Sequence, residues 1–279
     1  MLAHDRFGEG PRIVLVLHGF LGSRRNLASL ARALVDHDAA LSVVTLDLTG
    51  HGESPALPDD ADLATLGRDV LDTATALAVP FPLCVVGHSL GGRVALRAAA
   101  LEPQAVGSVT LLDIAPGAAS SSSSTGDIDR VLDALHRAPA EAASREAVAT
   151  PLREAGLERA TIDWLLMNLE RDDHRYRWRV DREKLAALHR RIVAEDLWGV
   201  VEGRHAGRVH EIRGGRSSYV TEADVRRFEA CGSSVDTIPE ASHWLHVERP
   251  RETAKLITLF ITREGGRHAV CNAPARGAP

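Results

Sequence analysis

Short apolar runs alternate along the chain with longer segments whose apolar residues recur every three or four positions. The apolar runs are typical of strands buried on both faces, and they cover residues 13–17, 41–48, 83–86, 109–114, 209–212 and 235–238. The segments with helical spacing cover residues 26–35, 62–77, 93–101, 221–231 and 250–263. Because strands alternate with helices, the pattern predicts an α/β fold with a mostly parallel, doubly wound sheet and helices on both faces.

The middle of the chain departs from this alternation. Residues 116–126 (PGAASSSSSTG) have the composition of a flexible linker. From Ile128 to about Val201 the pattern is helical, without a buried-strand run, which indicates an insertion between two strands of one sheet. The Gly-, Arg-, Ala- and Pro-rich end of the chain predicts a tail without fixed structure. The expected organisation is a core of residues 1–116 and 205–263, a helical insertion at 117–204 and a tail at 264–279.

Charge and cysteine content exclude several classes of protein. The 279-residue chain has a net charge of -5, whereas a general nucleic-acid binder carries a basic face. Three scattered cysteines (Cys84, Cys231 and Cys271) indicate neither a disulfide framework nor a cysteine-based zinc site. No apolar run approaches the ~20 residues of a membrane helix, and the first residues do not resemble a signal peptide. We therefore expect a cytoplasmic protein without nucleic-acid or membrane partners.

The most informative motif is Gly87-His88-Ser89-Leu90-Gly91-Gly92, which lies between the apolar run LCVV and the helical segment RVALRAAAL. It matches G-x-S-x-G in the strand–turn–helix context in which a strained turn presents a nucleophilic serine. The Leu90 N–H lies at the start of a helix, where donors are unpaired and negative charge is favoured. The alternative is a glycine-rich turn without chemistry.

With this motif in place, the sequence resembles the α/β-hydrolases, most closely the small serine esterases of the YbfF and ABHD11 type. The resemblance spans most of the chain and is carried by LHGFLGSRRN (17–26), LDLTGHGESP (46–55), VVGHSLGGRVAL (85–96), LLDIAP (111–116), RWRV (177–180) and ASHWLHVERP (241–250). It implies an α/β-hydrolase fold in which residues 117–204 form a helical lid, and an activity that needs no metal or organic cofactor. Haloalkane and epoxide chemistry is disfavoured, because those relatives have Asp where Ser89 stands.

A base is predicted at His243, which follows the last strand and precedes the last helix. This position completes the order Ser, acid, His along the chain. The alternative is a metal pair of His243 with His246, for which the sequence offers no further ligands at suitable spacing. We interpret His246 as a packing residue, His88 as a spacer in the elbow and His18 as a residue that shapes its loop.

The acid is less obvious from the sequence. Most α/β-hydrolases place it after the penultimate strand, where this chain has Ser217. Asp113 ends the strand that follows the nucleophile strand, at the sheet edge where catalytic groups gather, and the resemblance carries an Asp there. We predict Asp113 as the acid, against the alternative that it only starts the lid. Ser217 is expected to hydrogen-bond the histidine or support its loop, and Glu222 and Asp224 to begin a helix.

An oxyanion hole is predicted from the backbone N–H groups of Phe20 and Leu90, because two such donors can stabilise a tetrahedral oxyanion. The alternative for Phe20 is a plain turn with its side chain in the core. The resemblance implies that Asp47 and the segment Gly50-His51-Gly52 form a structural turn without a catalytic role.

Three of the four tryptophans (Trp164, Trp178 and Trp198) lie in the predicted lid, and lids line acyl pockets and exclude water. We take Trp164, Trp178 and Trp244 as candidate substrate-binding residues, although each could instead only attach the lid to the core. Residues 175–180 (RYRWRV) alternate with period two, as in a strand. Their arginines are interpreted as a solvated face, with phosphate recognition on an acyl-CoA or contacts to single-stranded nucleic acid as alternatives.

The predicted function is a serine hydrolase that cleaves short- to medium-chain carboxylic esters or thioesters, with acyl-CoA among the candidate substrates. The expected partner is therefore a small acyl ester or thioester. Three enzymatic alternatives share the fold: a C–C hydrolase, a lyase of the menaquinone-pathway type and a perhydrolase. A non-catalytic binder that keeps the pocket is a further alternative. The sequence leaves open the physiological substrate and whether the protein is a monomer or a dimer.

Overall fold

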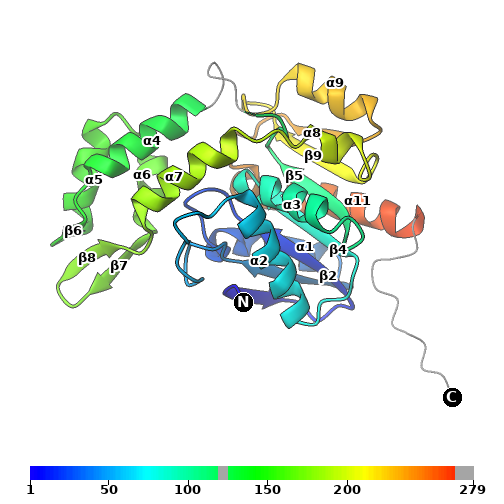
Figure 1. The fold of residues 1–279 in the computed structure, drawn as a ribbon, viewed down its shortest axis with the longest axis horizontal. Coiled ribbons are helices and arrows are strands. Elements are labelled where there is room, and N and C mark those ends of the chain that lie inside the picture. Colours follow the sequence, from blue (N-terminus) through cyan, green and yellow to red (C-terminus); the bar gives the residue numbers. More distant parts are fainter. Residues whose placement is uncertain (119–124, 268–279) are drawn as a thin grey trace.

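The computed structural model describes residues 1–118 and 125–267, and its centre is a seven-stranded sheet in the order β1-β3-β2-β4-β5-β9-β10 (Figure 1). Neighbouring strands are parallel, except that β1 is antiparallel to β3. The predicted α/β fold with a mostly parallel sheet is confirmed. The strands are β1 (His4–Phe7), β2 (Arg12–Leu17), β3 (Leu41–Leu46), β4 (Leu83–His88), β5 (Val106–Leu112), β9 (Val209–Gly214) and β10 (Ser234–Ile238).

The central strands are apolar throughout because both faces of the sheet are covered. On β2, Val14 and Val16 pack into one buried cluster with residues of α1 and α11, whereas Leu15 and Leu17 pack into a second cluster with residues of α2 and α3. Full burial of such a side chain contributes about 1.5–3 kcal/mol. The helices are α1 (Ala28–His37) and α11 (Pro250–Arg267) on one face, and α2 (Leu63–Ala76) and α3 (Leu90–Leu101) on the other.

The chain between β5 and β9 forms an insertion, which we call the lid. In Figure 1 its green helices and strands lie to one side of the central sheet. Its helices are α4 (Thr125–Arg137), α5 (Arg145–Glu154), α6 (Arg159–Leu166) and α7 (Arg182–Val193), and the short α8 (Trp198–Glu202) leads back to the sheet. The lid also holds an antiparallel sheet, in the order β6-β8-β7, made of β6 (Glu141–Ala142), β7 (Leu169–Asp172) and β8 (Arg175–Trp178).

Strand β8 is the segment whose period-two alternation predicted a strand. Its arginines are exposed, and they pair with acidic side chains of the same small sheet. Arg177 Nε lies 2.7 Å from Glu170 Oε1, and Arg175 Nη1 lies 3.4 Å from Glu141 Oε2. Both arginines therefore form ion pairs within the lid, as expected for a solvated face.

The remaining elements are the 3-10 helix η1 (Arg24–Leu27) and the helices α9 (Glu222–Ala230) and α10 (Leu245–Glu248). Helix α11 continues to Arg267, so the first four residues of the predicted tail, 264–267, are helical. Part of the predicted linker (119–124) and the rest of the predicted tail (268–279) lie outside the described residues. None of the described helices is long and apolar enough to cross a bilayer.

Candidate active site

Ser89 lies on the turn between β4 and α3, with φ 51° and ψ -114°. A positive φ at a residue other than glycine costs about 1–3 kcal/mol and persists only where the surroundings enforce it. The neighbouring glycines allow this close packing. A Cβ on Gly87 would lie 2.3 Å from the carbonyl carbon of Gly91, and a Cβ on Gly91 would lie 2.5 Å from the carbonyl oxygen of Leu17. The G-x-S-x-G spacing therefore permits the strained turn that presents Ser89.

His243 and Asp113 form a hydrogen-bonded pair at the same edge of the sheet. His243 Nδ1 lies 2.7 Å from Asp113 Oδ2, and the Asp113 side chain is completely buried. Two more groups donate to this carboxylate: the Gly214 N–H, at 2.9 Å from Oδ1, and the Ser217 hydroxyl, which reaches Oδ2. The carboxylate is thus held in one orientation toward the imidazole.

Two rings enclose the His243 imidazole. Tyr219 stacks on it with a centroid separation of 3.9 Å and an interplanar angle of 16°, and His88 lies on it at 4.6 Å. The Nε2–H of His88 donates to the His243 carbonyl oxygen over 2.9 Å, so the elbow residue supports the loop of the predicted base.

The histidines beneath this loop are uncharged at neutral pH. Burial, reinforced by the neighbouring His246 and His243, holds the pKa of His88 well below its usual value. Burial also lowers the pKa of His246 to about 3. Within residues 1–118 and 125–267 no three His, Cys, Asp or Glu side chains gather as metal ligands. His246 packs its ring 4.1 Å from that of His88, which fits the packing role expected of it.

The loop that follows β2 carries the predicted oxyanion donor Phe20, and hydrogen bonds to the segment after β3 hold this loop in place. His51 Nε2 accepts the Leu21 N–H over 3.2 Å, and His18 Nε2 accepts the Leu48 N–H over 2.9 Å. Burial lowers the pKa of His18 to about 4 and that of His51 to about 3, so both rings remain neutral and keep an acceptor nitrogen at neutral pH.

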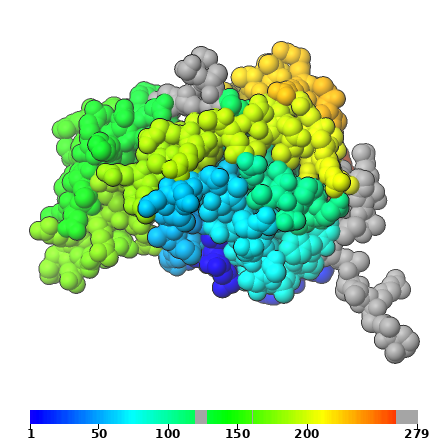
Figure 2. Space-filling view, viewed as in Figure 1, coloured from blue at the N-terminus to red at the C-terminus, as the bar shows by residue number. Residues whose placement is uncertain are grey.

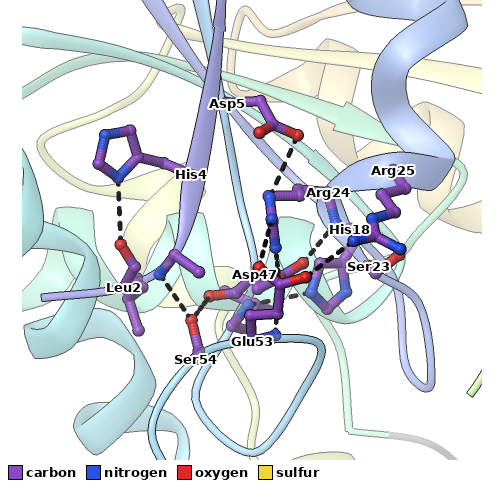
Figure 3. A network of polar contacts seen from close by, with 12 residues as sticks. Leu2, His4, Asp5, His18, Ser23, Arg24, Arg25, Asp47, Glu53 and Ser54 are labelled. Atoms are coloured by element: carbon purple, nitrogen blue, oxygen red, sulfur yellow. Dashed lines mark hydrogen bonds and ion pairs between the residues drawn. The ribbon is translucent and has the colours of Figure 1, made fainter. Parts of the chain in front are cut away.

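Asp47 anchors the end of the same loop (Figure 3). Its buried carboxylate accepts the Arg24 N–H over 2.6 Å and the Glu53 N–H over 2.8 Å, and it pairs with the Arg24 guanidinium. Arg24 also pairs with Asp5 at 3.1 Å and with Glu53 at 2.8 Å. This network is consistent with the structural role expected of the 46–55 segment.

Two cavities meet at Ser89. The first has a volume of about 310 Å³ and the second about 330 Å³. Phe20, Ser89 and Tyr219 line both of them. The first cavity adds Leu90 and aliphatic side chains, among them Ile114, Ile192 and Val193. The second adds His243, Trp164 and Trp244. The structure therefore brings the candidate nucleophile, base and oxyanion residues around one connected space.

Trp178, which we expected to bind substrate, does not line either cavity. Its indole N–H donates to the Pro139 carbonyl oxygen over 2.9 Å, and the Arg182 guanidinium lies 5.5 Å from its ring centroid. Trp178 therefore packs within the lid. Trp198 packs on Phe228 at 4.8 Å. In contrast, Trp164 and Trp244 lie 5.0 Å apart across the boundary between lid and core.

Sequence reasoning did not identify three residues of the site. Tyr219 stacks on His243, Arg93 lines the first cavity, and Glu211 is a buried carboxyl group beside Asp113. An available signal for Arg93 was its place in a largely apolar helix, one turn after Ser89. The position of Glu211 in the strand-like run 209–212, between His210 and Ile212, was a comparable signal, because Glu is almost never fully buried without a partner.

A parallel sheet with a serine on a strained strand-to-helix turn is the architecture of the hydrolases that use a nucleophile elbow. Residues 13–256 match the α/β hydrolase family, and the chain belongs to it. It is 30% identical to the sn-1-specific diacylglycerol lipase ABHD11 of Danio rerio, with 93% of this chain and 82% of the lipase covered. It is 26% identical to the esterase YbfF of Escherichia coli, with 93% and 96% covered.

The solved structure of a marine microorganism esterase is similar over 93% of this chain and 98% of its own, with a TM-score of 0.82 and 25% identity. The resemblance to esterases of the YbfF and ABHD11 type is thereby confirmed. These comparisons identify the chain as an ester-hydrolysing member of the α/β hydrolases.

Proposed function

We propose that this α/β hydrolase is a serine esterase in which Ser89 is the nucleophile, His243 the general base and Asp113 the acid of a catalytic triad. One observation carries the proposal: the buried Asp113 carboxylate accepts the Nδ1–H of His243, and His243 and Ser89 line the same cavity. A buried carboxylate in this position fixes the tautomer of the imidazole and stabilises the imidazolium that forms.

The reaction would proceed through an acyl-enzyme. Ser89 Oγ attacks the acyl carbonyl while His243 takes its proton, and the Phe20 and Leu90 N–H groups bind the oxyanion. His243 then donates the proton to the leaving oxygen or sulfur. Water, activated by His243, releases the acid and restores Ser89. No step requires a metal or an organic cofactor.

The two cavities would hold different parts of the substrate. Because His243 must protonate the leaving group, the leaving group would occupy the cavity that His243 lines, together with Trp164 and Trp244. The acyl chain would then enter the first cavity, among aliphatic side chains such as Ile192 and Val193. A volume of about 310 Å³ supports short- to medium-chain acyl groups. The proposed partner is therefore a small acyl ester or thioester.

The test is hydrolysis of nitrophenyl esters and acyl-CoAs of graded chain length, together with labelling by a fluorophosphonate. Ser89→Ala should lower kcat by at least about 10⁴-fold and abolish labelling, because removal of the nucleophile disables the whole triad. Circular dichroism should show a folded variant. Activity that survives in Ser89→Ala would refute the mechanism. Labelling of Ser89 without turnover of any ester would instead favour another reaction of the same fold.

We propose the cytoplasm as the location of this activity. Cys231 is a half-buried free thiol. Free thiols of this kind are usual where glutathione keeps cysteines reduced. A fractionation of cells that express the chain would test this proposal.

A further inference from the structure

Glu211, on β9, is a fully buried carboxyl group next to the proposed triad. Its Oε1 accepts the N–H of Asp113 over 3.1 Å, and its side chain is shielded completely from solvent. Its Oε2 has no hydrogen-bond partner among the described residues. A buried glutamate is costly unless it is paired or neutral, so this carboxyl group needs an explanation.

The surroundings of Glu211 disfavour a negative charge on its carboxyl group. Burial raises the pKa of Glu211 well above its usual value, and the negative charge of Asp113 acts in the same direction, with a smaller effect from Asp224 of α9. The adjacent His210 packs on Phe260, a residue of α11 on the opposite face of the sheet. Hydrogen bonds from the backbone N–H groups of Asp113 and Ile114 act in the opposite direction, but burial has the largest effect, so the surroundings favour the neutral form of Glu211.

The backbone of Asp113 requires support. Its φ is 56°, in the left-handed region, immediately after β5 ends. Such a conformation costs about 1–3 kcal/mol unless the surroundings enforce it. Here the Asp113 N–H is held by two acceptors, the Ile212 carbonyl oxygen at 3.0 Å and Glu211 Oε1 at 3.1 Å. Both acceptors come from β9, and the β5–β9 register pairs Leu111 with Glu211.

We propose that Glu211 is a positioning residue for the catalytic acid: as a buried hydrogen-bond acceptor it fixes the left-handed backbone of Asp113 and thereby directs the carboxylate to His243 Nδ1. This inference rests on the proposed function, because it requires Asp113 to act as the acid of the triad. Glu211 itself touches no reacting atom. It acts only through Asp113.

The experiment compares Glu211→Gln, which keeps a neutral acceptor of the same shape, with Glu211→Leu, which removes the acceptor. Glu211→Gln should keep kcat within about three-fold of the wild type. Glu211→Leu should lower kcat about ten-fold or more with little change in KM, because small errors in the placement of catalytic groups slow the reaction strongly. Should Glu211→Leu fail to fold, Glu211→Met provides the same comparison.

The pH profile of kcat/KM distinguishes an effect of Glu211 on the position of Asp113 from an effect on the stability of the fold alone. The acid limb of kcat/KM reports the protonation of His243, whose titratable neighbours are Asp113, His88, Tyr219 and His246. A misdirected Asp113 carboxylate stabilises the imidazolium of His243 less. The acid limb of the kcat/KM profile should therefore move to lower pH in Glu211→Leu, whereas it should stay in place in Glu211→Gln. The matched control His210→Leu removes a buried polar side chain from the other face of β9. It should lower stability without moving the limb.

A double-mutant cycle with Asp113→Asn completes the test. In the Asp113→Asn background Glu211→Leu should cause no further loss of kcat. An unchanged kcat and pH profile in Glu211→Leu, an equal loss in Glu211→Gln, or additive losses in the double variant would each overturn the inference. If Asp113→Asn alone is fully active, the proposed function fails, whereas a normal Asp113→Asn defect with a silent Glu211→Leu refutes only the role of Glu211.

Discussion

Ser217 and His243 both donate a hydrogen bond to the same oxygen of the Asp113 carboxylate. Asp113→Asn should therefore lower kcat by about 10⁴-fold, as expected when the triad loses its carboxylate. Adding Ser217→Asp should restore part of this activity, because the new side chain starts beside the position that Asp113 Oδ2 occupied. Steady-state ester hydrolysis measures both effects.

Ser217→Ala in the wild-type background is the matched control for this pair. It removes one donor to Asp113 but leaves the carboxylate and the His243 contact, so a loss of about ten- to a hundred-fold is expected, in line with the ~1.5–3 kcal/mol of one charge-assisted hydrogen bond. If Asp113→Asn kept full activity while Ser217→Ala lost it, the assignment of the acid would be wrong.

Buried histidines with lowered pKa values make stability depend on pH. Burial lowers the pKa of His18 to about 4 and the pKa values of His51 and His246 to about 3, and it holds the pKa of His88 well below its usual value. Below the usual histidine pKa of about 6.5, the unfolded chain binds these protons and the folded chain does not. Stability should therefore fall as the pH falls from about 6.5 toward 4, by up to about 1.4 kcal/mol per pH unit for each histidine.

Urea unfolding at pH 7, 6 and 5 would measure this slope, and the variant His246→Phe isolates one histidine. The ring of His246 is buried, and its Nδ1 has no partner among the described residues, so an aromatic hydrocarbon can replace it. In this variant the free energy of unfolding should depend less steeply on pH, by the contribution of one histidine. An identical slope would mean that His246 is not neutral in the folded protein.

The identities of the candidate nucleophile, base and acid follow from local sequence and chain order. Ser89 is identified by the G-x-S-x-G motif and His243 by its place after the last strand. Asp113 is identified by its place at the end of the strand that follows the elbow. Tyr219 has no such signal, and a glutamate in a strand-like run marks Glu211 without showing its partner, because both roles depend on which atoms the β5–β9 pairing and the loop after β9 bring beside Asp113 and His243. Long-range register of this kind is not encoded in a local pattern of residues.

At the scale of elements, Arg93 connects the nucleophile helix α3 to both ends of the lid. Its guanidinium donates to the carbonyl oxygens of Gly117 over 2.9 Å and of Ile192 over 3.0 Å, and also to that of Glu195. Because Arg93 is almost fully buried, Arg93→Met should lower the free energy of unfolding by about 3 kcal/mol, as expected when charged hydrogen bonds are lost and carbonyls remain unpaired.

Arg97→Met on the same helix is the control for Arg93. Arg97 pairs with the Glu195 carboxylate, but its side chain is 30% exposed, so the loss should stay below about 1 kcal/mol. Urea unfolding of the two variants measures the difference. Equal losses would show that Arg93 is not a special connection between the lid and α3.

The apolar runs predicted the central strands well because both faces of the sheet are buried. The strands that were missed, β1, β6 and β7, have largely exposed or half-buried side chains, so hydrophobicity does not mark them. Strand β8 was visible only as an alternation of arginines with other residues. The aromatic content of the lid indicated a lining of the pocket, yet only the packing decides that Trp164 faces the cavity and Trp178 does not.

At the scale of the whole molecule, the lid contacts the core on more than one side. Asn168 Nδ2 donates to the Leu21 carbonyl oxygen over 2.8 Å, so the lid touches the loop of the proposed oxyanion hole. On another side Arg191 donates to the Ala61 carbonyl oxygen over 2.7 Å, and Figure 2 shows the yellow-green chain of α7 against the blue and cyan chain that precedes and includes α2. Trp164 of the lid also packs on Trp244 of the core, and the second buried cluster is itself continuous from core to lid.

This continuity predicts that the lid and the core unfold together. Three of the four tryptophans lie in the lid, so tryptophan fluorescence reports mainly on this part, while far-UV circular dichroism reports on all helices and strands. The two signals and the loss of ester hydrolysis should follow one urea transition, which is the test of two-state behaviour. The variant Asn168→Ala, which removes one polar contact of the lid, should shift all three curves equally. A fluorescence transition at lower urea than the other two would show that the lid opens or unfolds by itself.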